Sequence, residues 1–139
     1  MHQSKHRIHE SMEHVDEAIA LSAMYAANHL EGVTSIICMS ETGATPLLMS
    51  RIKSSLPIFT FSRHHSTQHR VTMFRGVQTV PFDSEAIEPG ETNARAVDEL
   101  VRMGVVKDGD LVVITKGDYV NAQGGTNTMK IIRVGADIR

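Results

Sequence analysis

The chain has 139 residues, of which 41% are hydrophobic and 22% are charged, which is the size and balance of one ordinary globular domain. This length excludes a two-domain enzyme within these residues. Lysine and arginine number 14 against 16 acidic residues, so the net charge of -2 provides no basic field for nucleic acid or an anionic membrane. No stretch approaches the roughly 18 to 20 apolar residues of a membrane span, and the start of the chain has no signal-peptide core, which predicts a cytoplasmic protein.

Cysteine and aromatic residues are scarce. Cys38 is the single cysteine, so it cannot form an internal disulfide, and no CxxC pair is present for zinc or redox chemistry. Aromatic residues make up 4% of the chain, without any tryptophan. The core must therefore consist mainly of aliphatic side chains, as in a buried parallel sheet flanked by helices.

The chain begins with a polar segment and a helical pattern. Residues 1–12 are polar and lack a clean period, which is typical of a tail or a linker, so the domain is expected to cover residues 13–139. From Glu13 to about Glu31, apolar and small residues recur at three and four positions, which predicts an amphipathic helix ended by Gly32. The stripe expected to face the sheet consists of Val15, Ala18, Ile19, Ser22, Ala26 and Leu30.

Short β-branched and apolar runs then alternate with helical patterns. The predicted strands are Thr34–Met39, Leu56–Phe61, Val77–Val80, Leu111–Thr115 and Thr128–Val134. The predicted helices run from Thr45 to about Ser55, from about Ser66 to Phe74, and from Thr92 to Met103.

Local signals mark the ends of two of these helices. Thr45 is expected to cap the first of them, with Pro46 in its first turn, where a missing N–H costs nothing. Gly104 ends the helix that starts at Thr92. The residues of that helix expected to face inward are Ala94, Val97, Leu100 and Val101.

This alternation predicts an α/β fold with three αβα layers. The sheet is expected to have five strands, mostly parallel, with an antiparallel edge strand at the end of the chain. Thr128–Val134 alternates polar and apolar residues, as an edge strand does. Because an unpaired edge invites another chain, we expect this strand to lie near a subunit interface.

The strongest candidate for a functional site follows the first strand. It lies between that strand and a helix start, where free backbone N–H groups, a flexible glycine and hydroxyl groups suit a phosphate. In the alternative interpretation, Thr45 only caps the helix and the other hydroxyls satisfy a turn. Glu41 would repel an anion, so we expect it to face outward or to meet a sugar hydroxyl. The segment consists of Ser40, Glu41, Thr42, Gly43, Ala44 and Thr45.

Two basic residues follow other strands at the same predicted edge. Arg63 and Lys116 are candidates for charge-assisted contacts to a phosphate, with ordinary exposed basic residues as the alternative. His64 and His65 are adjacent without a carboxylate cluster nearby in sequence, which disfavours a metal or phosphohistidine site. No partner for them or for Glu41 is evident, and no catalytic acid, base and nucleophile come together.

The connection before the last strand is long for a hairpin. Residues 117–127 contain three glycines, two of them Gly124 and Gly125, and are a candidate lid that could also contact phosphate; the alternative is a flexible turn. Cys38 lies in the buried first strand and is expected to be a small core residue.

Several separated motifs resemble the C-terminal domain of pyruvate kinase, from about Glu13 to Val134. The resemblance is carried, in the family's order, by Ser40-Glu-Thr-Gly-Ala-Thr45, Phe61-Ser-Arg-His64, Phe74-Arg-Gly-Val77, Gly109-Asp-Leu-Val-Val-Ile-Thr115 and Gly125-Thr-Asn-Thr-Met129.

The resemblance implies a regulatory domain that binds a phosphorylated effector and contributes to a homotetramer. In this family the reaction of phosphoenolpyruvate with ADP takes place on a (β/α)8 barrel assisted by Mg2+ and K+, and this chain is too short to contain that barrel. The chain is then expected to need no cofactor itself, to be inactive alone, and to have the barrel domain as a partner.

The resemblance also bears on the effector. Glu41 and Asp118 resemble the bacterial branch that responds to AMP or sugar monophosphates, with fructose bisphosphate less favoured. Two other functions remain as alternatives: a phosphosugar isomerase-like enzyme, and a purely structural assembly domain.

Overall fold

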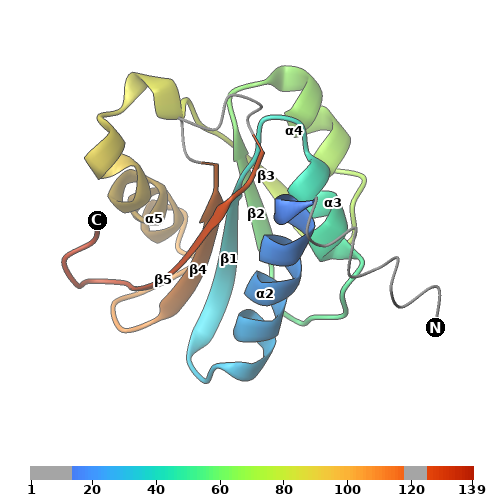
Figure 1. Ribbon diagram of the computed structural model, residues 1–139. Helices are drawn as coiled ribbons and strands as arrows, with labels where there is room; N and C mark the ends of the chain where they lie inside the picture. Colours follow the sequence, from blue (N-terminus) through green and yellow to red (C-terminus); the bar gives the residue numbers. More distant parts are fainter. Residues whose placement is uncertain (1–13, 118–124) are drawn as a thin grey trace.

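The computed structural model describes residues 14–117 and 125–139 of the chain. Its centre is a five-stranded sheet in the order β3-β2-β1-β4-β5 (Figure 1). The first four strands are parallel to one another, and the last is antiparallel to its neighbour. The strands are β1 (Val33–Met39), β2 (Ile58–Ser62), β3 (Val77–Pro81), β4 (Leu111–Lys116) and β5 (Thr128–Arg133).

Helices cover both faces of the sheet, so the predicted three-layer αβα fold is confirmed. On one face lie α2 (Val15–His29), α3 (Ala44–Ser50) and α4 (His65–Val71), and on the other lies α5 (Thr92–Arg102) (Figure 1). The connection from β3 to α5 contains two short 3-10 helices, η1 (Ser84–Ala86) and η2 (Pro89–Glu91).

The change of face follows from the path of the chain. From β1 the chain moves outward to β2 and β3, and then returns past β1 to β4. Because parallel crossovers are right-handed, the outward connections place α3 and α4 on one face and the returning connection places α5 on the other. The strand order therefore reverses at β1, and ligands of open α/β sheets bind beyond the carboxyl end of such a strand.

The buried face of α2 differs from the predicted stripe. Val15 and Leu30 are exposed, and the helix buries Ala20, Ala23, Met24 and Ala27 instead. Three of these four are alanines, which let the helix lie close to the sheet. The α5 stripe is partly wrong as well, because Val101 is 42% exposed, while Val97 and Leu100 are buried as expected.

Helix ends were predicted with mixed success. The helix expected to run from Thr45 to about Ser55 is α3, which begins at Ala44 and ends at Ser50. Gly104 follows α5 with a φ of +76°, as expected for a glycine that ends a helix. The predicted tail and most of the predicted lid, including Gly124, lie outside the described residues. Within the described part, no helix is long and apolar enough to cross a membrane.

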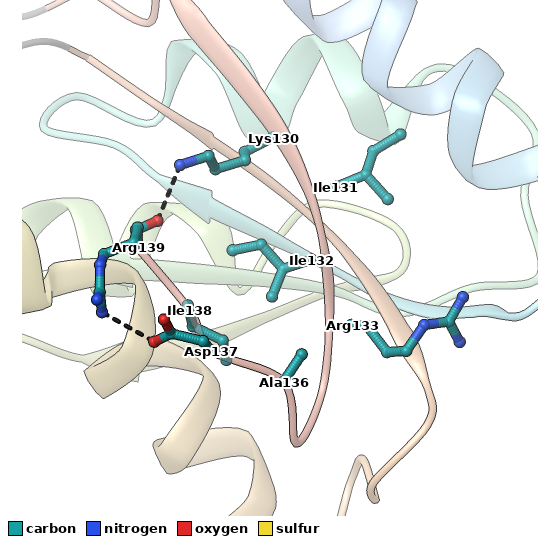
Figure 2. Close-up of a pocket in the computed structure, with 8 residues that line it drawn as sticks. All are labelled: Lys130, Ile131, Ile132, Arg133, Ala136, Asp137, Ile138 and Arg139. Carbon is teal, nitrogen blue, oxygen red and sulfur yellow. Dashed lines mark hydrogen bonds and ion pairs between the residues drawn. The ribbon is translucent and has the colours of Figure 1, made fainter.

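A shallow pocket lies beside the edge strand β5. It is lined by residues 130–133 and 136–139, and none of these is a predicted site residue (Figure 2). The main-chain carbonyl of Arg139 closes one side of it by accepting hydrogen bonds from Lys130 Nζ at 2.9 Å and from Asn93 Nδ2 at 2.8 Å. The pocket thus reflects how residues 134–139 pack against β5 and α5.

Candidate functional site

The carboxyl ends of three neighbouring strands bring the predicted site segments to one edge of the sheet. Cys38 in β1 pairs with Thr60 in β2 and with Thr115 in β4. Because these strands are parallel, the residues that follow each of them emerge at the same level. The loop Ser40–Thr45, called the hydroxyl loop below, therefore lies at this edge with Arg63 and Lys116.

The hydroxyl loop is shaped by Gly43. This glycine has a φ of +90°, a left-handed conformation that other residues adopt at a cost, and it occupies the N-cap position of α3. Its N–H donates to Ser40 Oγ at 2.9 Å, and the N–H of Ala44 donates to Thr42 Oγ1 at 3.3 Å. The alternative interpretation is thus partly right, because Ser40 and Thr42 do accept turn hydrogen bonds.

The predicted capping role of Thr45 is wrong. Because Gly43 is the N-cap, Thr45 is the second residue of α3 and is 2% exposed. Its hydroxyl donates to Thr126 Oγ1 at 2.8 Å, across 81 positions of sequence. Thr126 lies in one of the motifs that carry the family resemblance, but it is not among the predicted site residues.

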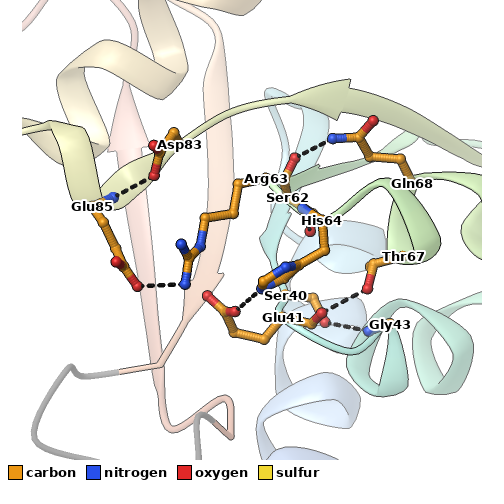
Figure 3. A network of polar contacts seen from close by, with 10 residues as sticks. All are labelled: Ser40, Glu41, Gly43, Ser62, Arg63, His64, Thr67, Gln68, Asp83 and Glu85. Atoms are coloured by element: carbon orange, nitrogen blue, oxygen red, sulfur yellow. Dashed lines mark hydrogen bonds and ion pairs between the residues drawn. The ribbon is translucent and has the colours of Figure 1, made fainter.

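Helix α4 holds the hydroxyl loop from one side. Thr67 Oγ1 donates to the carbonyl of Glu41 at 2.6 Å, and the Arg70 guanidinium donates to the carbonyl of Thr42 at 2.5 Å (Figure 3 for Thr67). Sequence reasoning missed both residues. They lie 26 and 28 positions from their partners, and nothing local in the sequence marks such a pairing.

These two contacts orient the peptide groups of the loop. In a trans peptide the C=O and the following N–H point in opposite directions. Since the Glu41 carbonyl points to α4, the Thr42 N–H points away from α4. The N–H groups of Glu41 and Thr42 have no acceptor among the residues that the structure describes. The two carbonyl oxygens of the loop are therefore occupied by α4, while two backbone N–H groups are left as donors, and an anion binds to such donors.

Glu41 has a partner that the sequence did not reveal. His64 Nε2 lies 2.5 Å from Glu41 Oε2, and both side chains are close to 40% exposed, at 40% and 44% (Figure 3). The interpretation that His64 and Glu41 lack partners is therefore wrong. The backbone N–H of His64 also donates to Ser62 Oγ at 3.2 Å, which fixes the start of α4.

The two basic residues are placed at the same edge in different ways. The Arg63 guanidinium forms an ion pair of 2.7 Å with Glu85 in η1, whose backbone N–H is bound by Asp83 (Figure 3). A contact of Arg63 with a phosphate would compete with this ion pair. The Lys116 carbonyl accepts from the Asn127 N–H at 3.1 Å and from Thr128 Oγ1 at 2.9 Å. These bonds hold the segment that begins at Gly125 against the end of β4.

The described residues contain no group of three or more His, Cys, Asp or Glu side chains that could hold a metal ion. Cys38 is fully buried, and burial raises the pKa of its thiol to about 12. A thiol that stays protonated is a poor nucleophile, in agreement with its expected place in the core.

Comparison with known proteins identifies the family. The family model described as "Pyruvate kinase, alpha/beta domain" matches residues 17–132. The chain is 50% identical to pyruvate kinase II of Salmonella typhimurium and 46% identical to a pyruvate kinase of Buchnera aphidicola, in each case over 94% of this chain and 27% of the relative. It is 34% identical to the pyruvate kinase of Geobacillus stearothermophilus, over 90% of this chain and 21% of that protein.

The chain thus spans about a quarter of the length of these relatives. The match covers most of the described residues, and the chain belongs to the pyruvate kinase alpha/beta domain family, the C-terminal domain of these enzymes.

Proposed function

We propose that this chain is the regulatory domain of a pyruvate kinase and binds a phosphorylated effector, a sugar monophosphate or AMP, at the hydroxyl loop. The observation that carries the proposal is the orientation of the loop. Its carbonyl groups at Glu41 and Thr42 are bound by Thr67 and Arg70, while the N–H groups of Glu41 and Thr42 lack an acceptor in the described part of the chain.

Side-chain hydroxyls supply the remaining donors. Ser40 and Thr42 use their oxygen atoms to accept the N–H groups of Gly43 and Ala44. Each hydroxyl retains its own hydrogen for a further acceptor. Because α3 has only seven residues, its dipole contributes little, and these individual donors carry the proposed binding. Arg63, Lys116, Gly124 and Gly125 remain proposed contacts to the effector.

The position of Glu41 favours a single phosphate. Its carboxylate lies at the exposed end of the loop, beside His64. A second phosphate group near this carboxylate would be repelled, whereas a ribose or hexose hydroxyl could donate to it. A monophosphate with a sugar portion therefore suits the loop better than a bisphosphate.

We propose that catalysis takes place on a separate barrel domain, which converts phosphoenolpyruvate and ADP into pyruvate and ATP with Mg2+ and K+. This chain would regulate that barrel domain in the cytoplasm, as part of a homo-oligomer. We propose that the chain alone is inactive. Strand β5 lies at the sheet edge and is our candidate for the subunit contact.

Calorimetric titration tests the binding proposal. We expect saturable binding of AMP or glucose 6-phosphate to the chain, and no binding of adenosine or glucose, which lack the phosphate. If neither phosphorylated compound binds, a structural assembly domain is favoured and the proposal fails. Isomerisation of glucose 6-phosphate would favour the enzyme alternative, with Glu41 and His64 as its acid–base pair. Formation of ATP from phosphoenolpyruvate and ADP by this chain would contradict the non-catalytic role.

A further inference from the structure

Thr45 and Thr126 form a buried hydroxyl pair that joins the hydroxyl loop to the start of β5. Their oxygen atoms lie 2.8 Å apart, and the residues are 2% and 5% exposed. Two hydroxyls at this distance share one hydrogen bond, so one oxygen donates and the other accepts. The bond is assigned with Thr45 as the donor, and the same oxygen positions also accommodate the reverse direction.

This direction has a consequence for an anion at the loop. A hydroxyl has one hydrogen, so Thr45 cannot donate to Thr126 and to a phosphate oxygen at the same time. If Thr126 donates to Thr45 instead, the hydrogen of Thr45 becomes available. Hydroxyl groups rotate about their C–O bonds, so the pair reverses without moving either oxygen. A chain of hydrogen bonds from Thr126 through Thr45 to the anion would also polarise each member.

Thr126 is itself tied to the neighbouring strand. The N–H of the next residue, Asn127, donates to the Lys116 carbonyl at 3.1 Å, and Thr128 Oγ1 donates to the same carbonyl at 2.9 Å. The hydroxyl of Thr126 therefore projects from a segment anchored to β4. Together with the bond to Thr45, this anchoring fixes the position of the Thr126 oxygen.

We propose that Thr126 is a positioning residue of the phosphate site. It holds the Thr45 hydroxyl in place, and when an anion binds it reverses the shared hydrogen bond so that Thr45 donates to the phosphate. It thereby couples occupancy of the hydroxyl loop to the segment that leads into β5. This inference rests on the proposed function for its ligand, but the coupling between the two threonines exists without ligand and is tested separately.

The ligand experiment measures AMP affinity by calorimetry for three variants of the 139-residue chain. We expect Thr126→Val to weaken binding about tenfold, the effect of losing one hydrogen bond of about 1.4 kcal/mol. Thr126→Ser, which keeps the hydroxyl, should bind as the wild type does. Thr34→Val is the control, because it removes a threonine hydroxyl that bonds Asp110 at the opposite end of β1 from the hydroxyl loop, and it should leave affinity unchanged.

A double-mutant cycle separates positioning from a general loss of structure. Because Thr45→Val and Thr126→Val remove the same hydrogen bond, their effects on AMP affinity should be clearly less than additive. Additive losses, or wild-type affinity in Thr126→Val, would overturn the proposal.

The ligand-free experiment uses hydrogen exchange at the Asn127 amide. We expect Thr45→Val to speed exchange at this amide, and Thr42→Val, which alters an exposed hydroxyl in the same loop, to leave it unchanged. Exchange rates are compared with those of core amides in β1, so that a global loss of stability is recognised. Unchanged exchange in a folded Thr45→Val protein would overturn the coupling. Failure of the wild type to bind AMP or glucose 6-phosphate would instead overturn the proposed function, and the exchange result would still decide the coupling.

Discussion

His64 Nε2 lies 2.5 Å from Glu41 Oε2 and thereby joins the start of α4 to the hydroxyl loop. Both side chains are too exposed, at 40% and 44%, for this contact to contribute much to stability. Exposed ion pairs contribute about 0 to 1 kcal/mol. The pair matters instead for the acceptor groups near the loop, because the His64 imidazole donates to one oxygen of the Glu41 carboxylate and keeps it engaged.

Replacement of His64 tests this role. In His64→Ala the carboxylate of Glu41 loses its neighbour and opposes an incoming phosphate more strongly, so we expect AMP affinity to fall about two- to fivefold, corresponding to roughly 0.4 to 1 kcal/mol. The free energy of unfolding should change by less than about 1 kcal/mol. His65→Ala, at the exposed neighbouring histidine, is the matched control. Equal affinities of the two variants in calorimetry would show that the pair has no influence on the anion.

Substitution of Gly43 should destabilise the protein more than substitution of another left-handed glycine. Gly43 has a φ of +90°, and an added Cβ would lie 3.3 Å from Val71 Cγ1. Gly104 has a φ of +76°, but a Cβ there would meet nothing within 4 Å. The left-handed conformation costs a non-glycine residue about 1 to 2 kcal/mol.

Urea denaturation of Gly43→Ala and Gly104→Ala separates the two effects. The left-handed conformation should lower the free energy of unfolding of both variants. The decrease should be larger for Gly43→Ala, because the new Cβ contacts Val71, which is fully buried and cannot move away freely. It should also bind AMP more weakly, since the loop changes shape. A Gly43→Ala protein as stable as Gly104→Ala would indicate that the loop relaxes without disturbing α4.

Replacement of Thr45 by Val should affect stability and binding together. It leaves the hydroxyl of Thr126 buried without its partner, which costs about 1 to 3 kcal/mol in the free energy of unfolding. It also removes a donor to the proposed anion, and hydrogen bonds to charged groups contribute about 1.5 to 3 kcal/mol. Urea denaturation and calorimetry measure the two losses. Full AMP affinity in a folded Thr45→Val protein would place the phosphate site elsewhere.

The fold could be predicted from sequence because its signals are local. Apolar runs such as Leu111–Thr115 and glycines such as Gly104 mark element type and ends without reference to the rest of the chain. The buried face of α2 could not be predicted in this way. Alanine and serine occur around much of that helix, so hydrophobic periodicity does not distinguish Ala20 and Ala23, which are buried, from Ala18 and Ser22.

The candidate site was located by sequence, but its internal contacts were not. The strand, the glycine and the hydroxyls identify the hydroxyl loop as a local pattern. The partners of that loop are Thr67, Arg70, His64 and Thr126, at sequence separations of 23 to 81 residues. Such pairings depend on the spatial order of β2, β1 and β4 in the sheet, so the spacing of residues within one segment does not reveal them. The assignment of Thr45 as a helix cap failed for a local reason, because Gly43 is the N-cap of α3 and Thr45 is the second residue of the helix.

Cys38 provides a prediction of pH dependence. Burial raises the pKa of its thiol from 9.0, the ordinary value, to about 12 in the folded protein. The thiol is therefore neutral in both states well below pH 9, and its burial then imposes no ionic cost on folding. As the pH rises above 9, the unfolded chain releases the proton and the folded protein does not. This difference stabilises the unfolded state, so stability falls as pH rises from about 9 to about 12.

The comparison of wild type with Cys38→Ala isolates this effect from the titration of lysines and tyrosines, which both proteins share. Between pH 9 and pH 12, the free energy of unfolding of the wild type should fall relative to that of the variant by about 1.4 kcal/mol per pH unit. Urea denaturation at several pH values measures the two curves, and iodoacetamide provides an independent check. Because the thiol is buried and protonated, alkylation of the folded protein at pH 8 should be slow and should become fast in urea. Parallel pH curves together with rapid alkylation of the folded protein would show that solvent reaches Cys38, and the position of β1 at the centre of the sheet would then need revision.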